Sequence, residues 1–243
     1  MNFEMIEIAW DTHTHTLHSH GTGTVEQNVR AAIEKGFTKI VISDHGPQHL
    51  FYNIKDVDAY LKDIDAMRKK YKNDIEVLAG VEFNLLSEDG DMDLPPQYAD
   101  AFDIHLMGYH KLARFLGLRN NVHFLLPKSH SEKAVRRNTQ AYINAMDKNR
   151  IDIITHIGYG IPVDKLAVAK HAAKVGTALE INAKHPEFTT GELMECAKTG
   201  VLFSIGSDAH SIDRIGDFAP ALKKAEEAGL MPEQVINARR NEL

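Results

Sequence analysis

The sequence predicts an α/β protein built as a distorted, TIM-like barrel of seven β/α units, and three observations support this. Short runs rich in Ile, Val and Leu alternate with segments of helical periodicity, the order typical of parallel strands joined by helical crossovers. Seven such runs occur, one fewer than in the eight-fold barrel. No glycine-rich nucleotide-binding loop follows a run, which disfavours the alternative, a doubly wound open sheet.

The expected elements follow one another in a regular order. Strands are predicted at residues 6–10, 39–43, 75–81, 104–107, 151–155, 178–181 and 201–205. Helices are predicted at 24–35, 55–71, 131–148, 163–174, 190–198 and 219–228, with a further turn after Pro232. The first helix should begin with a capping box formed by Thr24 and Gln27 and end at Gly36.

The bulk composition is that of one soluble globular enzyme domain spanning residues 1–243. Of the 243 residues, 43% are hydrophobic and 26% are charged, which is ordinary for this class. No apolar run approaches the ~20 residues of a membrane span, and the first residues lack the basic flank of a signal peptide. The single cysteine, Cys196, excludes an intrachain disulfide and fits a reducing compartment. We therefore expect a cytoplasmic protein.

The charge pattern limits the classes of binding partner that are expected. The formal net charge is −6, and the sequence lacks the basic stripe that a long nucleic acid requires. Lys133, Arg136 and Arg137 are better explained as the solvated face of a helix. We expect a small phosphorylated partner, no long nucleic acid and no membrane, while the oligomeric state stays open. The unusual number is that of the histidines, which is 14.

Groups that can bind a metal follow six of the seven predicted strands. Parallel strands place their carboxyl ends at one rim of a barrel, where sites are built, so these groups should meet. One lone histidine would be weak support for a metal site, but the joint pattern is strong. The groups are Asp11, His13, His15 and His20 after the first strand, Asp44 and His45 after the second, Glu82 after the third, His110 after the fourth, His156 after the fifth, and Asp208 and His210 after the seventh.

The residue types and their spacing favour a cluster of transition metals. His13 and His15 are two apart, and so are Asp208 and His210, so each pair can face one side. Imidazole and carboxylate groups without thiolates suit zinc, manganese or iron. The groups are too many for one tetrahedral ion. We expect two or three ions with Glu82 as the bridge.

These motifs resemble those of the PHP (polymerase and histidinol phosphatase) family, in order and over nearly the whole chain. The matching segments are residues 11–15 with 19–21, 43–46, 80–82, 155–156 and 206–210. Two further segments, 108–110 and 138–141, resemble the small stand-alone PHP phosphatases that hold three metal ions. The family fold is a distorted seven-stranded barrel, in agreement with the strand count.

The resemblance implies a division of the ligands among three divalent ions (Zn, Mn or Fe). His18 falls at a variable position and is expected to be a neighbour, whereas Asp11 and Asp44 are expected to orient histidine rings. Glu82, Asp208 and His210 are the expected catalytic residues. The implied ligands are His13, His15, Glu82 and Asp208 for the first ion, Glu82, His110 and His156 for the second, and His20, His45 and His210 for the third.

The expected activity is hydrolysis of a small phosphomonoester by direct attack of a metal-bound hydroxide, without a phospho-enzyme. His185, His18 or a metal-bound water would protonate the leaving group. Lys184 and Arg214 are expected to contact the phosphate. Residues 111–130 are long for a connection and are expected to form a lid or specificity element, in which His123 and His130 are loop residues.

Several alternatives remain at this point. A phosphodiesterase or nuclease of the same family is the main one. A metal-dependent amidohydrolase is less favoured, because Glu82 stands where that group usually has a lysine. A non-catalytic module of a DNA polymerase would have lost ligands, and all nine positions are filled here. No residue selects a substrate such as histidinol phosphate, and the ligand set does not choose among the metals.

Overall fold

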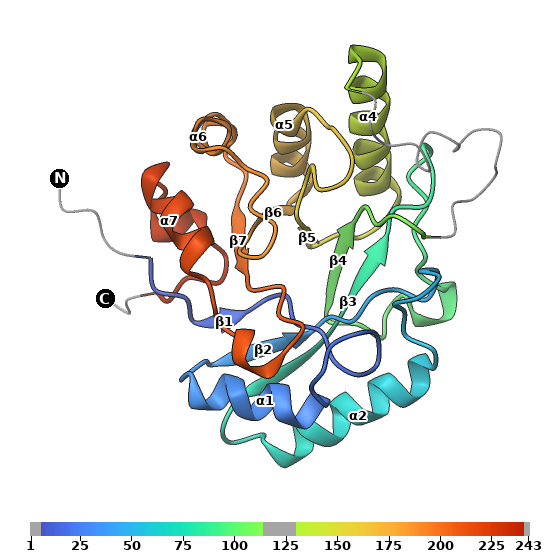
Figure 1. Cartoon of the computed structure of the whole chain (residues 1–243), viewed down its shortest axis with the longest axis vertical. Helices are drawn as coiled ribbons and strands as arrows, with labels where there is room; N and C mark the ends of the chain where they lie inside the picture. Colours follow the sequence, from blue (N-terminus) through green and yellow to red (C-terminus); the bar gives the residue numbers. More distant parts are fainter. Residues whose placement is uncertain (1–5, 114–129, 241–243) are drawn as a thin grey trace.

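Seven parallel strands form the centre of the molecule. The computed structural model describes residues 6–113 and 130–240 (Figure 1). Within this part of the chain, the strands pair in sequence order in one sheet. They are β1 Trp10–Asp11, β2 Lys39–Ile42, β3 Glu76–Asn84, β4 Ile104–Gly108, β5 Ile153–Ile154, β6 Ala178–Asn182 and β7 Phe203–Gly206.

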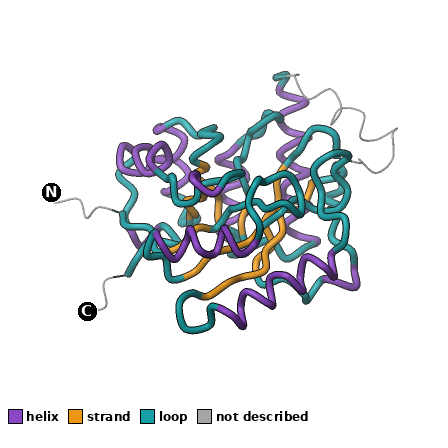
Figure 2. The backbone as a smooth tube through the Cα atoms, turned by 60° about the horizontal axis from the view of Figure 1, so that its bottom comes forward, coloured by secondary structure: helices purple, strands orange, loops and turns teal. Residues whose placement is uncertain are grey.

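Helices cover the outside of this sheet (Figure 2). In Figure 1, α1 and α2 lie along one side and α4 to α7 along the other. None of the helices in the described residues is long and apolar enough to cross a membrane. The helices are α1 Val25–Glu34, α2 Val57–Lys70, α4 Glu132–Lys148, α5 Lys165–Val175, α6 Thr190–Ala197 and α7 Ala219–Glu227, with the short 3-10 turns η1 Pro96–Tyr98, η2 Ile212–Arg214 and η3 Pro232–Gln234.

The sheet curls into a nearly closed barrel, which confirms the predicted fold class. At the carboxyl end, Thr14 and Ala209 form a parallel bridge between the chain after β1 and the chain after β7. At the amino end, residues 235–238 enter the gap, where Val235 bridges Phe203 and Ala238 bridges Ile8. The last segment of the described chain therefore takes the place that an eighth strand would occupy.

The predicted first strand was wrong in its position. Residues 6–10 were expected to form it, but only Trp10 and Asp11 pair with β2, because Ile8 bridges Ala238 instead. The fifth strand is also shorter than expected, and β3 runs three residues further, so Glu82 lies within the strand. The first helix is confirmed: Thr24 and Gln27 form the capping box, and Gly36 has a φ of 73°.

The barrel interior changes from apolar to polar along the strands. Residues two apart in a strand share a face, so Ala178 and Glu180 of β6 point to the same side, as do Ile153 and Thr155. Ala178 and Ile153 belong to one apolar cluster, whereas Glu180 and Thr155 belong to the buried polar groups. The barrel is thus sealed by apolar side chains at its amino end and filled by polar ones at its carboxyl end.

Candidate metal centre

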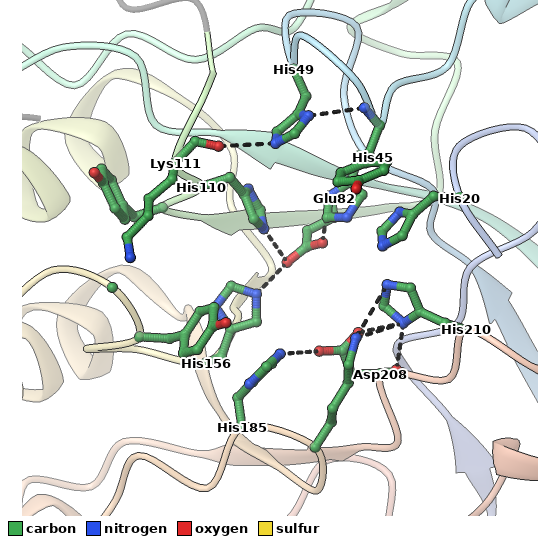
Figure 3. Close-up of a pocket in the computed structure, with 15 residues that line it drawn as sticks. His20, His45, His49, Glu82, His110, Lys111, His156, His185, Asp208 and His210 are labelled. Atoms are coloured by element: carbon green, nitrogen blue, oxygen red, sulfur yellow. Dashed lines mark hydrogen bonds and ion pairs between the residues drawn. The ribbon is translucent and has the colours of Figure 1, made fainter. Parts of the chain in front are cut away.

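The carboxylate of Glu82 lies at the centre of the polar end. Its Oε1 is 2.8 Å from His156 Nε2 and 3.2 Å from His110 Nε2. Its Oε2 is 3.0 Å from His45 Nδ1 and 3.3 Å from His13 Nε2. Figure 3 shows the rings of His45, His110 and His156 around this carboxylate. One buried side chain therefore faces imidazoles that come from four different strand ends.

A second carboxylate, Asp208, lies beside the histidine pair that follows β1. The Nε2 atoms of His13 and His15 are 3.0 Å apart, and His15 Nε2 is 3.3 Å from Asp208 Oδ1. His210 Nδ1 is also 3.3 Å from Asp208 Oδ1. Asp208 has a φ of 50°, in the left-handed region that L side chains rarely adopt, so the turn after β7 holds this carboxylate with a strained backbone.

All nine side chains that the sequence singled out meet at this end of the barrel. One of the close sets of ligand atoms lies within the first set that the resemblance implied, and the other two combine residues from different implied sets. His20 stacks on His45, with ring centroids 4.9 Å apart, and lies 4.1 Å from His210. Three sets have ligand atoms within 4.8 Å of one another: His13, His15 and Asp208; His15, His45 and His210; and His45, Glu82 and His110.

Many of these buried atoms have no partner in hydrogen-bond geometry, including His45 Nδ1 and Glu82 Oε2, which lie only 3.0 Å apart. An unpartnered buried polar atom costs roughly 1–3 kcal/mol, and native proteins contain few of them. Such a concentration of nitrogen and oxygen donors fits zinc, manganese or iron, which prefer these ligands. Within the described residues, the unpartnered atoms of this cluster are Nδ1 of His15, His20, His45 and His156, Nε2 of His110 and Oε2 of Glu82.

Burial keeps most of these imidazoles neutral. Burial lowers the pKa of His45 to about 4, and burial together with His210 lowers the pKa of His20 to about 3. The pKa of His15 also falls well below its ordinary value, through burial and the neighbouring His45. A histidine must be neutral to bind a metal, so these rings need no proton removed near pH 7.

The two carboxylates remain ionised for the opposite reason. Burial raises the pKa of Glu82, but the surrounding histidines outweigh it and hold the pKa well below its usual range. Asp208 behaves in the same way beside His13 and His15. Burial lowers the pKa of His13, yet the carboxylates of Glu180 and Glu82 raise it well above its ordinary value. Glu82 also raises the pKa of His156 against the effect of burial, so the cluster combines anionic oxygens with imidazoles of lowered and of raised pKa.

Two of the rings are oriented by a partner on the nitrogen turned away from the centre. His13 Nδ1 is 2.8 Å from Glu180 Oε1, and His110 Nδ1 is 2.8 Å from Asn84 Oδ1. Partners of this kind fix the ring orientation in metal sites.

The role expected for Asp11 and Asp44 was wrong. Asp11 accepts hydrogen bonds from the backbone N–H groups of His13, Ser207 and Gly216. Asp44 accepts from Ser19 and from both the backbone and the side chain of Thr16. A short carboxylate at a strand end reaches the N–H groups of the next turn before it reaches a ring, so both residues brace loops.

Glu180 and Asn84 are functional candidates that the sequence reasoning missed. Glu180 lies inside the predicted strand 178–181, where an apolar side chain was expected. Asn84 lies two residues beyond Glu82, at the end of β3, and an amide alone is a weak signal for a metal site. A signal was present at β6, where a charged residue interrupts an otherwise apolar run, Ala178–Asn182. His49 was missed too, but it accepts from Tyr52 N–H at Nδ1, and its Nε2–H donates to the Lys111 carbonyl, so both ring nitrogens are used.

A cavity of about 340 Å³ opens onto this cluster (Figure 3). Lys184 lines it, with its Nζ 2.9 Å from His210 Nδ1. His185 stacks on Tyr159 at 3.9 Å between centroids and lines it as well. Arg214 is not among the lining residues, because it lies in η2 and pairs with Asp217 at 2.6 Å.

Two other expectations concern residues near the cavity. His18 was a candidate proton donor and the expected neighbour of the ligands, but it is turned toward α2 and pairs with Asp63 at 3.0 Å. It does not line the cavity. Most of the expected lid, residues 114–129 with His123, lies outside the described residues. His130 is exposed just before α4.

The sequence matches the family model of the PHP domain over residues 11–213. The chain belongs to the PHP family. Among its relatives is a "probable phosphatase" of Thermoanaerobacter sp. (strain X514), 32% identical over 96% of this chain and 91% of the relative. Another is a "probable phosphatase" of Shewanella sediminis, 31% identical over 93% of this chain and 88% of that protein.

Two solved structures share the fold at low sequence identity. A histidinol phosphate phosphatase from Lactococcus lactis, complexed with zinc, L-histidinol and phosphate, superposes with a TM-score of 0.62 at 15% identity, covering 91% of this chain and 94% of that one. A candidate histidinol phosphatase from Listeria monocytogenes gives 0.63 at 19% identity, covering 85% and 97%. At these identities the likeness shows a common fold.

Proposed function

We propose that this chain is a metal-dependent phosphoesterase that hydrolyses a small phosphomonoester. One observation carries the proposal: a buried set of imidazoles and carboxylates, many without partners, surrounds Glu82 at the floor of a cavity. The full-length similarity to relatives named as probable phosphatases supports phosphate esters as the substrate class.

The nine side chains would hold up to three divalent ions, with zinc, manganese and iron as the candidates. Glu82 would be shared between ions, because its two oxygens face different histidines. When bound, such a cluster supplies an activated water and neutralises the charge of the phosphate. The ligands are His13, His15, His20, His45, Glu82, His110, His156, Asp208 and His210.

The lining residues bind and orient the substrate. The ammonium group of Lys184 lies over the Asp208 and His210 side of the cavity, where it donates to a phosphate oxygen. The stacked rings of His185 and Tyr159 form a wall that contacts the leaving group. Burial lowers the pKa of His185 to about 4, so its neutral ring offers one N–H to the ester oxygen.

The size of the cavity favours a small substrate over a polymer. A volume of about 340 Å³ is at the lower end of the range for small-molecule sites, roughly 300–1,000 Å³. The Lactococcus lactis protein of the same fold binds L-histidinol and phosphate, which are ligands of this size class.

A substrate comparison tests the proposal. The metal-loaded chain is assayed with p-nitrophenyl phosphate and a panel of small phosphomonoesters, beside bis-p-nitrophenyl phosphate and single-stranded DNA. We expect turnover of monoesters, reduced on the order of a thousandfold in a Glu82→Gln control. Rapid cleavage of the diester or of DNA with no monoester turnover would assign the site to a phosphodiesterase or nuclease instead.

A further inference from the structure

Glu180 is a buried carboxylate at the polar end of the barrel that belongs to none of the three ligand sets. It lies on β6 and is 1% exposed. No predicted metal ligand follows this strand. Its two oxygens have different hydrogen-bond partners, and these partners decide how the carboxylate can act on the neighbouring histidine.

One oxygen, Oε1, faces the ring of His13 at 2.8 Å from Nδ1. The other, Oε2, accepts two hydrogen bonds, from the His156 backbone N–H at 2.9 Å and from Asn182 Nδ2 at 2.8 Å. The Asn182 amide cannot be turned around, because its Oδ1 already accepts the backbone N–H groups of Lys184 and His185. Oε2 is therefore held between two fixed donors.

The neighbouring strand leaves room for this contact only because of a glycine. A Cβ at Gly206 of β7 would overlap Glu180 Oε1 and lie 2.9 Å from His13 Cβ. The pair formed by Glu180 and His13 thus occupies space that any other residue at position 206 would fill. This close fit holds the carboxylate in place against the ring.

We propose that Glu180 is a positioning residue that fixes the proton of His13 on Nδ1, so that Nε2 presents its lone pair to the metal site. The inference rests on the proposed function for the metal itself. A carboxylate only accepts hydrogen bonds, so Nδ1 must be the donor. Nε2 then faces Glu82 and Asp208, at 3.3 Å and 3.9 Å.

The isosteric change Glu180→Gln should reverse the proton position. A glutamine has one acceptor and one donor end. The two fixed donors at the Oε2 position require the amide oxygen there, so the NH2 group must face His13 Nδ1. That nitrogen then becomes an acceptor and the ring proton moves to Nε2, which is the atom offered to the metal.

The experiment has two readouts. In the metal-free protein labelled with 15N-histidine, long-range 1H–15N spectra are recorded over a series of rising pH, because the neighbouring carboxylates raise the pKa of His13, and they report which ring nitrogen keeps its proton once the ring is neutral. In the neutral ring we expect a proton on Nδ1 in the wild type and none on Nδ1 in Glu180→Gln. A proton that stays on Nδ1 in the variant would overturn the inference.

The second readout is the affinity for zinc, measured by competition with a chromophoric chelator. We expect one bound equivalent to weaken about 10- to 100-fold in Glu180→Gln, the usual cost of losing the partner of a ligand. Asn237→Ala is the control for a general loss of stability, since Asn237 is equally buried but holds backbone groups of β1 and β7 and does not contact His13. Its zinc profile should match that of the wild type.

The outcomes separate the two claims. If Glu180→Gln and Asn237→Ala weaken zinc equally, Glu180 has a general structural role and the inference fails. If the wild type binds no zinc, the proposed function fails, and the position of the His13 proton in the metal-free chain still decides the role of Glu180.

Discussion

The two ends of the barrel satisfy their polar groups in opposite ways. At the amino end, the side chain of Asn237 is fully buried. It donates to the carbonyl oxygens of Trp10 and Ile205 at 2.9 and 2.7 Å and accepts from the Ile205 N–H at 3.0 Å. The side-chain amide of Asn237 thus takes the place of direct backbone hydrogen bonds between β1 and β7.

At the carboxyl end, buried imidazoles and a carboxylate oxygen are left without hydrogen-bond partners. Buried polar groups are normally paired, and each unpaired one lowers stability. The contrast indicates that Asn237 stabilises the closure of the barrel, whereas the cluster at the carboxyl end retains polar groups for a ligand. Changes at the two ends should therefore separate stability from activity.

The largest effect is expected at the centre of the polar end. Glu82→Gln removes the charge that faces five histidines, and we expect kcat/KM for a phosphomonoester to fall on the order of a thousandfold. The bound metal per chain should fall with it. Activity within a few fold of the wild type would contradict the role of Glu82 as a central metal ligand.

The next effect is one of stability at the amino end. Asn237→Ala leaves two carbonyls and one N–H unpartnered, so the free energy of unfolding should fall by about 2–4 kcal/mol. Urea denaturation of the metal-free chain measures it. Gln140→Ala on the exposed face of α4 is the control, with a change within about 0.5 kcal/mol. The zinc equivalents bound by folded Asn237→Ala should equal those of the wild type, and their loss would contradict the separation of the two ends.

A smaller effect is expected for the lysine in the cavity. Lys184→Ala removes a charge-assisted hydrogen bond to the phosphate, and KM should rise about tenfold. Inhibition by inorganic phosphate should weaken in parallel. Lys223→Ala is the control, since Lys223 is exposed on α7 and should leave KM unchanged. An unchanged KM in Lys184→Ala would place the phosphate elsewhere.

The smallest effect concerns the single cysteine. Cys196 is buried, and burial raises the pKa of its thiol to about 11, so a thiol reagent reacts only when the fold opens. Because Glu82 is not part of the amino-end seal, labelling rates of metal-free wild type and Glu82→Gln should agree within about twofold. Much faster labelling of the variant would show that the polar end also sustains the global fold.

Much of the fold was predictable because its signals are local. The Thr24–Gln27 capping box and the stop at Gly36 depend only on neighbouring residues. The position of the first strand was not predictable, because Ile8 has the same apolar character whether it pairs with β2 or with Ala238. The entry of residues 235–238 into the barrel joins the two ends of the described chain, and no local pattern encodes such a contact.

The candidate site was also predictable only in part. The nine side chains could be assembled from the sequence, since parallel strands bring their carboxyl ends together. Their grouping could not, because His15 and His45 each lie close to two sets of ligand atoms, and this depends on ring rotations. Glu180 escaped notice because a strand residue facing inward looks the same in the sequence as one facing outward.

The most direct test of the account is the removal and return of metal in one sample. A chelator is used to strip the chain, zinc or manganese is then added back in steps, and bound metal and phosphomonoester turnover are measured together. We expect no turnover in the stripped chain. Turnover should return as more than about two equivalents of metal bind to the histidines of the metal centre. Full turnover in the stripped chain, or a chain that binds no transition metal, would contradict it.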